Sequence, residues 1–412
     1  MNAKNLSLFL IALIIVLTGK AQNQNWNHYD QSNSGLPGNT VYSVTIDEQG
    51  NKWIGTDGDG MAKFDGTNWT VYNSSNSGLP NDTIWSITID DQGNKWIGTL
   101  GDGLAKFDGN NWTVYNQSNS GLPDNKVLSI AIDEQGNKWI GTTGGVAKFD
   151  ETNWTVFEAS NSDLPDNEVP SIAIDNQGNK WIGTIDGMVK LDDNNWNVYN
   201  ESNSGLPSNY VYDITIDEQG NKWIGLVGAF SGIVKFDGAN WTAYEASNAG
   251  LPDNGVLSIS IDDQGNKWIG TWGGGMAKFN NTSSTVYNNS NSGLPGNNVH
   301  SIAIDEQGNK WIGSGNGLAV FNENGVSIEE TQQIINNIRI YPNPVKGHLT
   351  IETLAENKII SIDIFSSQGK LIENKKIKNI HQTLNVSDLS KGLYILKIRT
   401  EEGWGMKKFI KQ

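Results

Sequence analysis

The chain has 412 residues, enough for two or three domains, and carries a formal net charge of −16. It contains no cysteine, which excludes a disulfide framework and thiolate chemistry. The acidic excess lies between Asn23 and Glu330, where 38 Asp and Glu stand against 14 Lys and Arg. Such a domain repels phosphate backbones, which argues against nucleic acid as a partner.

The N-terminus has the pattern of a signal peptide. Lys4 precedes an apolar run from Leu6 to Leu17, and small residues follow at Gly19 and Ala21. This run is too short to span a bilayer and has the length of a signal-peptide core. We therefore predict that residues 1–22 are removed on export, and we expect no membrane helix in the segments that follow.

A repeat dominates the next 300 or so residues. The string Gln-Gly-Asn-Lys-Trp-Ile-Gly occurs seven times at intervals of 42 to 45 residues, with its Trp at positions 53, 96, 139, 181, 223, 268 and 311. Within one unit, alternating β-branched and apolar residues, separated by Gly and Asn turns, predict strands at 84–89, 95–99, 104–107 and 112–115. Four short antiparallel strands per unit are typical of a β-propeller blade, and without helices to cover them such sheets must pack face to face around an axis.

The two ends of the repeat region predict how the ring closes. Residues 26–29 have the pattern of a fourth strand without the preceding three, whereas the last unit, 299–321, has three strands and no fourth. Pairing the two would complete seven blades of four strands and remove two exposed sheet edges. The expected fold class is therefore all-β, a seven-bladed β-propeller over residues 23–325 with 1+3 closure of the last blade.

The repeated residues also carry a family resemblance. The run Asn-Ser-Gly-Leu-Pro, the pattern Val/Ile-x-Ser-Ile-x-Ile-Asp, and the strings Gly-Asn-Lys-Trp-Ile-Gly-Thr and Gly-Gly-x-Ala-Lys-Phe resemble the two-component regulator propeller repeat. In that family, propellers often form the periplasmic sensor half of hybrid histidine kinases. The chain shows one propeller and no kinase motif, so the resemblance implies the fold and ligand binding rather than signalling.

After a polar linker, predicted at 326–337, the remaining residues 338–412 alternate as short strands. Six or seven strands in about 75 residues predict a small β-sandwich. The segment resembles the type A C-terminal sorting domain of the type IX secretion system of Bacteroidota, through Tyr341-Pro342-Asn343-Pro344, the run from Leu389 through Gly392 to Tyr394, and the basic end at Lys407 to Lys411. The resemblance implies that the type IX machinery carries the passenger to the outer-membrane surface, where the tag is removed and the protein is released or retained; the alternative is an ordinary accessory sandwich.

The sequence gives little support for catalysis. Of the four histidines, His28, His348 and His381 lie outside any expected site, so neither a Ser/His/Asp constellation nor a histidine metal cluster is evident. An Asp recurs at the same hairpin of every repeat, and calcium binding there is possible. The favoured interpretation is that each Asp hydrogen-bonds the backbone of its own turn, so no cofactor is expected. The recurring Asp residues are Asp47, Asp90, Asp133, Asp175, Asp217, Asp262 and Asp305.

The positions at which the repeats differ are the candidate binding site. The second residue of each inner strand varies, and the loop between the second and third strands varies as well, on what should be the same face of the propeller. Aromatic side chains there could stack on sugar rings while carboxylates accept hydrogen bonds from hydroxyls; the alternative is packing against neighbouring loops. The candidate ligand-binding residues are Tyr42, Trp85, Tyr212, Phe230, Trp272 and His300.

The expected function is a secreted or cell-surface binding module that recognises a carbohydrate or a protein and is exported by the type IX route. Two alternatives stay open: a secreted carbohydrate-active enzyme, such as a polysaccharide lyase or hydrolase, and a structural adhesion repeat. The near-identity of the repeats fits the last of these.

Overall fold

The structure is a computed structural model that describes residues 25–193, 195–228, 231–323, 338–353, 358–366, 371–379, 381–400 and 403–412. The predicted signal peptide at 1–22 and the predicted linker at 326–337 lie outside the described residues. Across these ranges, no helix is long and apolar enough to cross a membrane.

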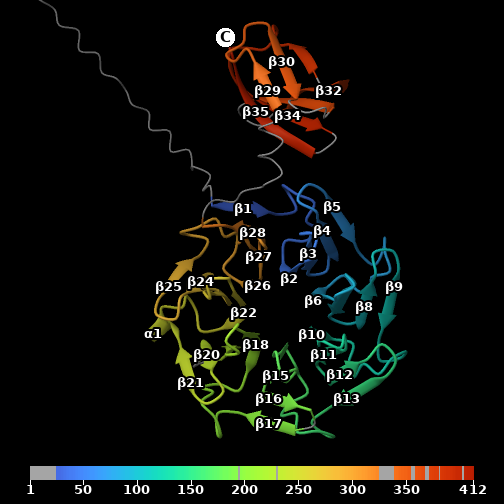
Figure 1. Ribbon diagram of the computed structural model, residues 1–412, viewed down its shortest axis with the longest axis vertical. Coiled ribbons are helices and arrows are strands. Elements are labelled where there is room, and N and C mark those ends of the chain that lie inside the picture. The colour runs from blue at the N-terminus through green and yellow to red at the C-terminus, as the bar shows by residue number, and fades with distance from the viewer. Residues whose placement is uncertain are drawn as a thin grey trace, which may run out of the picture.

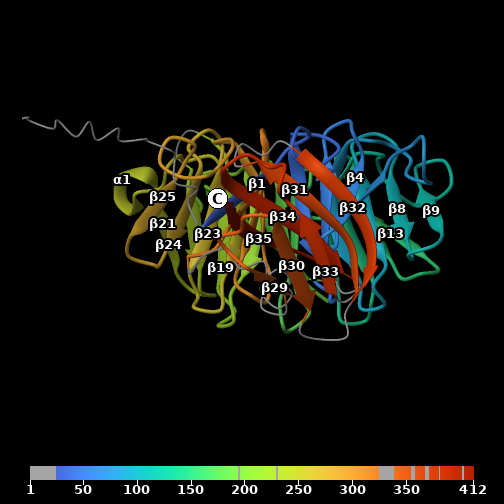
Figure 2. The ribbon, with the colours of Figure 1, turned by 90° about the horizontal axis from the view of Figure 1, so that it is seen from above.

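Seven four-stranded antiparallel sheets are arranged radially around one axis, with the first strand of each sheet innermost (Figure 1). Figure 2 shows the same ring edge-on. Blades 1 to 4 contain β2 (Val41–Ile46), β3 (Lys52–Thr56), β4 (Met61–Phe64) and β5 (Trp69–Tyr72); β6 (Ile84–Ile89), β7 (Lys95–Thr99), β8 (Leu104–Phe107) and β9 (Trp112–Tyr115); β10 (Val127–Ile132), β11 (Lys138–Thr142), β12 (Gly145–Phe149) and β13 (Trp154–Phe157); β14 (Ser171–Ile174), β15 (Lys180–Thr184), β16 (Gly187–Asp192) and β17 (Asn195–Tyr199). Blades 5 to 7 contain β18 (Val211–Ile216), β19 (Lys222–Leu226), β20 (Ile233–Phe236) and β21 (Trp241–Tyr244); β22 (Val256–Ile261), β23 (Lys267–Thr271), β24 (Met276–Phe279) and β25 (Ser284–Tyr287); β26 (Val299–Ile304), β27 (Lys310–Ser314), β28 (Gly317–Phe321) and β1 (Trp26–Tyr29).

The strand from the N-terminus completes the seventh sheet. β1 pairs antiparallel with β28, with Trp26 opposite Phe321 and Tyr29 opposite Leu318, and the sheet order is β1-β28-β27-β26. β2 of the first blade contacts β26 of the last, so the inner strands form a closed ring. The fourth strand of blade 7 therefore precedes the other three by about 270 residues in sequence.

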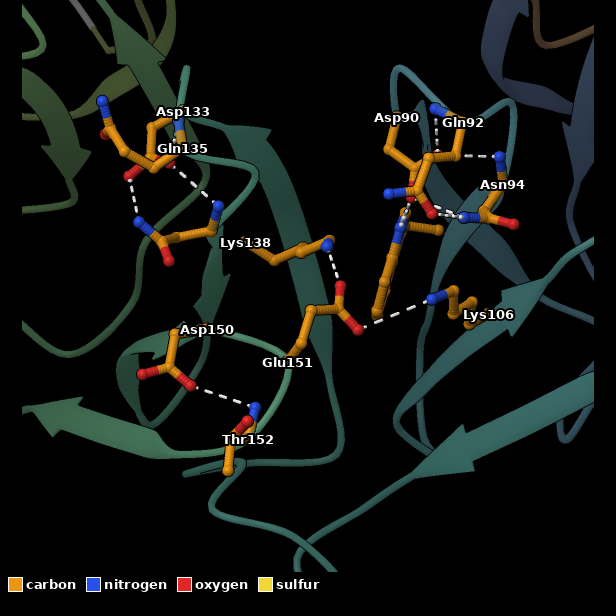
Figure 3. Close-up of polar contacts among 12 residues, drawn as sticks. Asp90, Gln92, Asn94, Lys106, Asp133, Gln135, Lys138, Asp150, Glu151 and Thr152 are labelled. Atoms are coloured by element: carbon orange, nitrogen blue, oxygen red, sulfur yellow. Dashed lines mark hydrogen bonds and ion pairs between the residues drawn. The ribbon is translucent and has the colours of Figure 1, made fainter.

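A tryptophan and an aspartate of each blade form the core between neighbouring blades. The Trp of the repeated string is buried in all seven blades, and its indole N–H donates to the Asp of the preceding hairpin, as Trp96 does to Asp90 at 2.9 Å. Figure 3 shows two of these hairpins with the ion pairs of Glu151 to Lys138 and Lys106 between them. The Lys that begins each second strand also lies over the Trp of the preceding blade, for example Lys95 at 4.6 Å from the Trp53 ring. These tryptophans therefore fill the space between neighbouring blades.

The links between blades pack against the outer strands. A Cβ built on Gly78 would lie 2.4 Å from Cβ of Trp112, so only glycine fits where the link crosses this tryptophan. Blades 4 and 6 differ from this pattern: Asp163 stands at the glycine position beside Trp196 in blade 4, and Ser284 replaces the outer Trp in blade 6. There the link contains the one helix among the described residues, α1 (Ala246–Ala249), and Ala249 joins the cluster around Phe279.

The C-terminal segment is a separate β-sandwich, as predicted. One sheet has the order β29-β30-β33 and the other has the order β32-β31-β34-β35. The core between them includes residues from both sheets, such as Leu349 and Leu396. The strands are β29 (Ile338–Tyr341), β30 (His348–Thr353), β31 (Ile359–Ser366), β32 (Leu371–Asn379), β33 (His381–Asn385), β34 (Gly392–Thr400) and β35 (Gly403–Lys411).

The residues of the expected sorting motif are part of this framework. Asn343, between Pro342 and Pro344, accepts a hydrogen bond from the Ile410 N–H at 2.9 Å and donates one to the Lys408 carbonyl at 2.9 Å. The chain after β29 is thereby fastened to β35. The Tyr341 hydroxyl donates to Glu352, and Tyr394, near Gly392 at the start of β34, stacks on Phe409 at 5.4 Å.

Candidate functional site

The inner strands enclose a cavity of about 260 Å³ at the centre of the ring. All seven inner strands contribute lining residues, from β2 of blade 1 to β26 of blade 7. In six of these strands the pairing with the second strand shifts by one residue between the first and third positions, as between Val41 and Ser43. Such a bulge re-aims side chains. The second and third residues of these six strands line the cavity, as do the equivalent Pro170 and Ser171 of blade 4, where β14 begins at Ser171.

The second residues form an uneven ring in which aromatic side chains gather on one side. Tyr42 and Trp85 contact one another with ring centroids 4.7 Å apart, and His300 meets Tyr42 edge-on at 5.2 Å. These residues come from blades 1, 2 and 7, which are neighbours around the ring. We call them the aromatic wall. Leu128, Pro170 and Leu257 are the apolar members of the ring, and Tyr212 of blade 5 is its seventh member.

The protonation states along the aromatic wall follow from burial. Burial lowers the pKa of His300, which favours the neutral imidazole at physiological pH. Partial burial, followed by the nearby Asp57 carboxylate, raises the pKa of Tyr42, whose hydroxyl donates to Asp57 at 3.3 Å. Burial likewise raises the pKa of Tyr212. This ring therefore presents neutral groups at neutral pH.

The third residues form a second ring that consists of six serines and one aspartate, Asp213. Several of them connect neighbouring blades. The hydroxyl of Ser43 accepts a hydrogen bond from the Ile87 N–H at 3.1 Å. Asp213 replaces such a hydroxyl in blade 5, because its Oδ2 accepts the Ile259 N–H at 2.7 Å. Ser86 is one of two described residues whose buried side-chain oxygen has no hydrogen-bond partner.

Asp213 has an unusual electrostatic environment. Burial raises the pKa of Asp213 to about 6, although hydrogen bonds from the Ile259 and Ile214 N–H groups and from the Ser171 hydroxyl act in the opposite direction. None of the ion pairs in the described parts of the chain involves Asp213. At neutral pH the cavity therefore contains a carboxylate that forms no ion pair with any lysine, arginine or histidine of the described residues.

The cavity brings together four of the six predicted binding residues: Tyr42, Trp85, Tyr212 and His300. Trp272 lies elsewhere. The residue is 61% exposed in the loop between β23 and β24, its backbone N–H donates to the Gly255 carbonyl at 2.9 Å, and it does not line the cavity. Phe230 lies outside the described residues.

Sequence reasoning missed Asp213. The signal was present, because six of the inner strands have Ser at the third position and the fifth alone has Asp, in Val211-Tyr212-Asp213. Histidines and the recurring hairpin aspartates do not draw attention to this position, because Asp213 is a single substitution where every other repeat has Ser.

The hairpin aspartates are fully engaged by their own turns. Asp90 accepts hydrogen bonds from the backbone N–H groups of Gln92 and Asn94, from the Asn94 side chain and from the Trp96 indole, at 2.8 to 3.1 Å. Burial opposes ionisation of Asp90, but these bonds outweigh it and lower the pKa. Within the described ranges, no group of three or more His, Cys, Asp or Glu is placed to hold a metal ion.

Comparison with known families identifies both parts of the chain. The two component regulator propeller model matches residues 35–58, 121–144, 163–186 and 293–316. The secretion system C-terminal sorting domain model matches residues 339–412. No sequence among the curated proteins matches this chain.

Solved structures share the fold at low sequence identity. The extracellular domain of a putative hybrid two component system from B. thetaiotaomicron is 24% identical with a TM-score of 0.63, over 94% of this chain and 57% of that one. PorZ, a surface component of the type IX secretion system of Porphyromonas gingivalis, is 18% identical with a TM-score of 0.59, over 93% of this chain and 61% of that one. Virginiamycin B lyase from Staphylococcus aureus is 14% identical with a TM-score of 0.57, over 72% of this chain and 98% of that one.

This chain thus spans about three fifths of the first two structures, and at these identities the likeness is one of fold. The match to a secretion sorting domain indicates a secreted or cell-surface protein. The chain therefore folds as a β-propeller in which four segments match the two component regulator propeller model, followed by a segment that matches the secretion system C-terminal sorting domain model.

Proposed function

We propose that this protein is a secreted or cell-surface binding module that recognises a carbohydrate in the cavity at the centre of the propeller. The observation that carries the proposal is the aromatic wall of Tyr42, Trp85 and His300 beside a ring of serine hydroxyls. A sugar ring presents an apolar face, which stacks on aromatic side chains, and an edge of hydroxyls, which require polar partners.

The size of the cavity supports recognition of a single residue of a saccharide. Pockets for drug-sized ligands begin at about 300 Å³, and the cavity holds about 260 Å³. A cavity of this size would hold one sugar ring, and the remaining residues of a longer glycan would lie outside the cavity.

A glycan-array screen of the mature chain tests the proposal. Selective binding that the double variant Tyr42→Ala/Trp85→Ala abolishes would support it. Trp272→Ala serves as the comparison, because Trp272 is exposed on the β23–β24 loop and lies away from the cavity. Loss of binding in Trp272→Ala alone would move the site to the loops, and an array without binding would reject a carbohydrate and favour a protein ligand.

A secreted carbohydrate-active enzyme is the second candidate, because of Asp213. A carboxyl group with a pKa of about 6 is suited to general acid–base chemistry near neutral pH. Hydrolysis of a glycosidic bond ordinarily uses two carboxyl groups, and of the described residues that line the cavity only Asp213 carries one. This argues for a lyase over a hydrolase within this class. Release of a product from a bound glycan, lost in Asp213→Asn, would establish turnover.

A further inference from the structure

The carboxylate of Asp213 is an unbalanced charge in the proposed ligand cavity. The second strands of blades 4, 5 and 6 direct their first lysines to other places: Lys180 lies over Trp139, Lys222 over Trp181 and Lys267 over Trp223. Burying a charge without a partner is costly, and such a group is a candidate for function. The six other blades avoid this cost by having serine at the same position.

The other titratable groups around the cavity do not compensate this charge. Tyr42, Tyr212 and His300 are neutral at physiological pH, because burial raises the pKa of the tyrosines and lowers that of the histidine. Glu168, in the link before β14, adds a second negative group; burial and then this nearby carboxylate raise the pKa of Tyr210. The cavity consequently has a negative potential, which the acidic propeller around it reinforces.

We propose that the carbohydrate bound in the cavity carries a free amino group, whose ammonium pairs with Asp213 while the sugar ring stacks on the aromatic wall. This inference rests on the proposed carbohydrate-binding function and names its substrate class. Blade 5 is separated from blades 7, 1 and 2 around the ring, so one ligand can meet Asp213 and the aromatic wall from two sides.

A cationic partner explains the observations better than a neutral one. A hydroxyl needs only a neutral acceptor, and a serine as in the other blades would serve. A carboxylate forms its strongest hydrogen bonds with a charged donor such as an ammonium, since charge-assisted hydrogen bonds are about twice as strong as neutral ones.

The test compares three β-1,4-linked tetrasaccharides of glucose that differ only at C2: the amine, the N-acetyl amide and the hydroxyl. Binding of each to the mature chain is measured by calorimetry at about pH 6.5. The amino sugar should bind roughly 10-fold to 100-fold more tightly than the other two, which is the advantage expected of a charge-assisted hydrogen bond. Its affinity should fall at pH 5, because Asp213 gains a proton.

Asp213→Ser should remove this preference without loss of the fold, because serine occupies the position in six other blades. Asp213→Asn keeps the shape of the side chain and should have the same effect. Asp91→Ser is the matched control. It also removes one negative charge, but Asp91 is an exposed residue of the β6–β7 hairpin and does not line the cavity. It should leave all three affinities unchanged.

The outcomes separate this inference from the function on which it rests. Equal binding of the three tetrasaccharides, or a preference for the amine that survives in Asp213→Ser, would overturn the role of Asp213 and leave carbohydrate binding intact. Failure of these sugars and of the full glycan array would remove carbohydrate binding itself. A preference lost in both Asp213 variants and kept in Asp91→Ser supports the inference.

Discussion

Asp213→Ser should make the propeller more stable at neutral pH, although it removes a side chain that accepts a hydrogen bond between blades. The carboxylate is half-buried without a cation, whereas a serine hydroxyl can accept the Ile259 N–H as Ser43 accepts that of Ile87. A rise in pKa from about 4 to about 6 corresponds to roughly 2.8 kcal/mol. Because the group also faces the solvent in the cavity, we expect about 1–2 kcal/mol after screening.

The sign of the effect makes it dependent on pH. The folded state holds the Asp213 proton more tightly than the unfolded chain, so the wild type loses stability as the pH rises from about 4 through about 6. The gain from Asp213→Ser should therefore be small near pH 4 and complete above pH 7. For a propeller of roughly 300 residues, it corresponds to a rise of about 2–3 °C in Tm at pH 7.5.

Thermal unfolding of the full mature chain, followed by tryptophan fluorescence, measures this difference, since fifteen of the sixteen tryptophans lie before residue 324. The decisive quantity is the difference in Tm between variant and wild type at pH 4.5 and at pH 7.5. A difference independent of pH would refute the argument from the buried charge. A variant less stable than the wild type at pH 7.5 would show that the Asp213 hydrogen bonds outweigh the cost of burying its charge.

Three further outcomes follow from the packing of the blades. Asp90→Ala should destabilise the propeller by about 2–3 kcal/mol, because the buried Trp96 N–H loses its acceptor, whereas Asp91→Ala on the exposed side of the same hairpin should have little effect. Gly78→Ala should lower the Tm, because its Cβ would meet the tryptophan of the next outer strand at 2.4 Å; Gly101→Ala, whose nearest neighbour is at 3.4 Å, should not. A chelator should leave the Tm of the wild type unchanged, since the oxygens of Asp90 are occupied by hydrogen bonds; a fall of several degrees would instead favour calcium at these hairpins.

Most of the propeller could be predicted from the sequence because its determinants are local and repeated. The strands predicted at 84–89, 95–99, 104–107 and 112–115 coincide with β6 to β9. Each is specified by a two-residue alternation between turns rich in Gly and Asn, and seven copies of the same pattern remove the ambiguity of any one. The two-sheet sandwich of residues 338–412 was predictable on the same basis.

The candidate site was predictable only in part. Variation at the second position of each inner strand pointed to Tyr42, Trp85, Tyr212 and His300, which all line the cavity. Trp272 varies in the same way, yet its loop holds it away from the cavity, exposed to solvent. Variation among repeats identifies positions free of packing constraints, but it does not say which of them face one another.

What the sequence by itself determined is the blade, the number of blades and the type of fold, because these depend on residues within one repeat. What only the tertiary structure decided is the chemistry at the centre of the ring. Two of the hydrogen-bond partners of Asp213 come from other blades, with Ser171 lying 42 residues before it and Ile259 lying 46 residues after it. Its missing counter-charge and its raised pKa arise only when seven distant strands are brought around one axis, where each side chain meets neighbours that its own repeat does not contain.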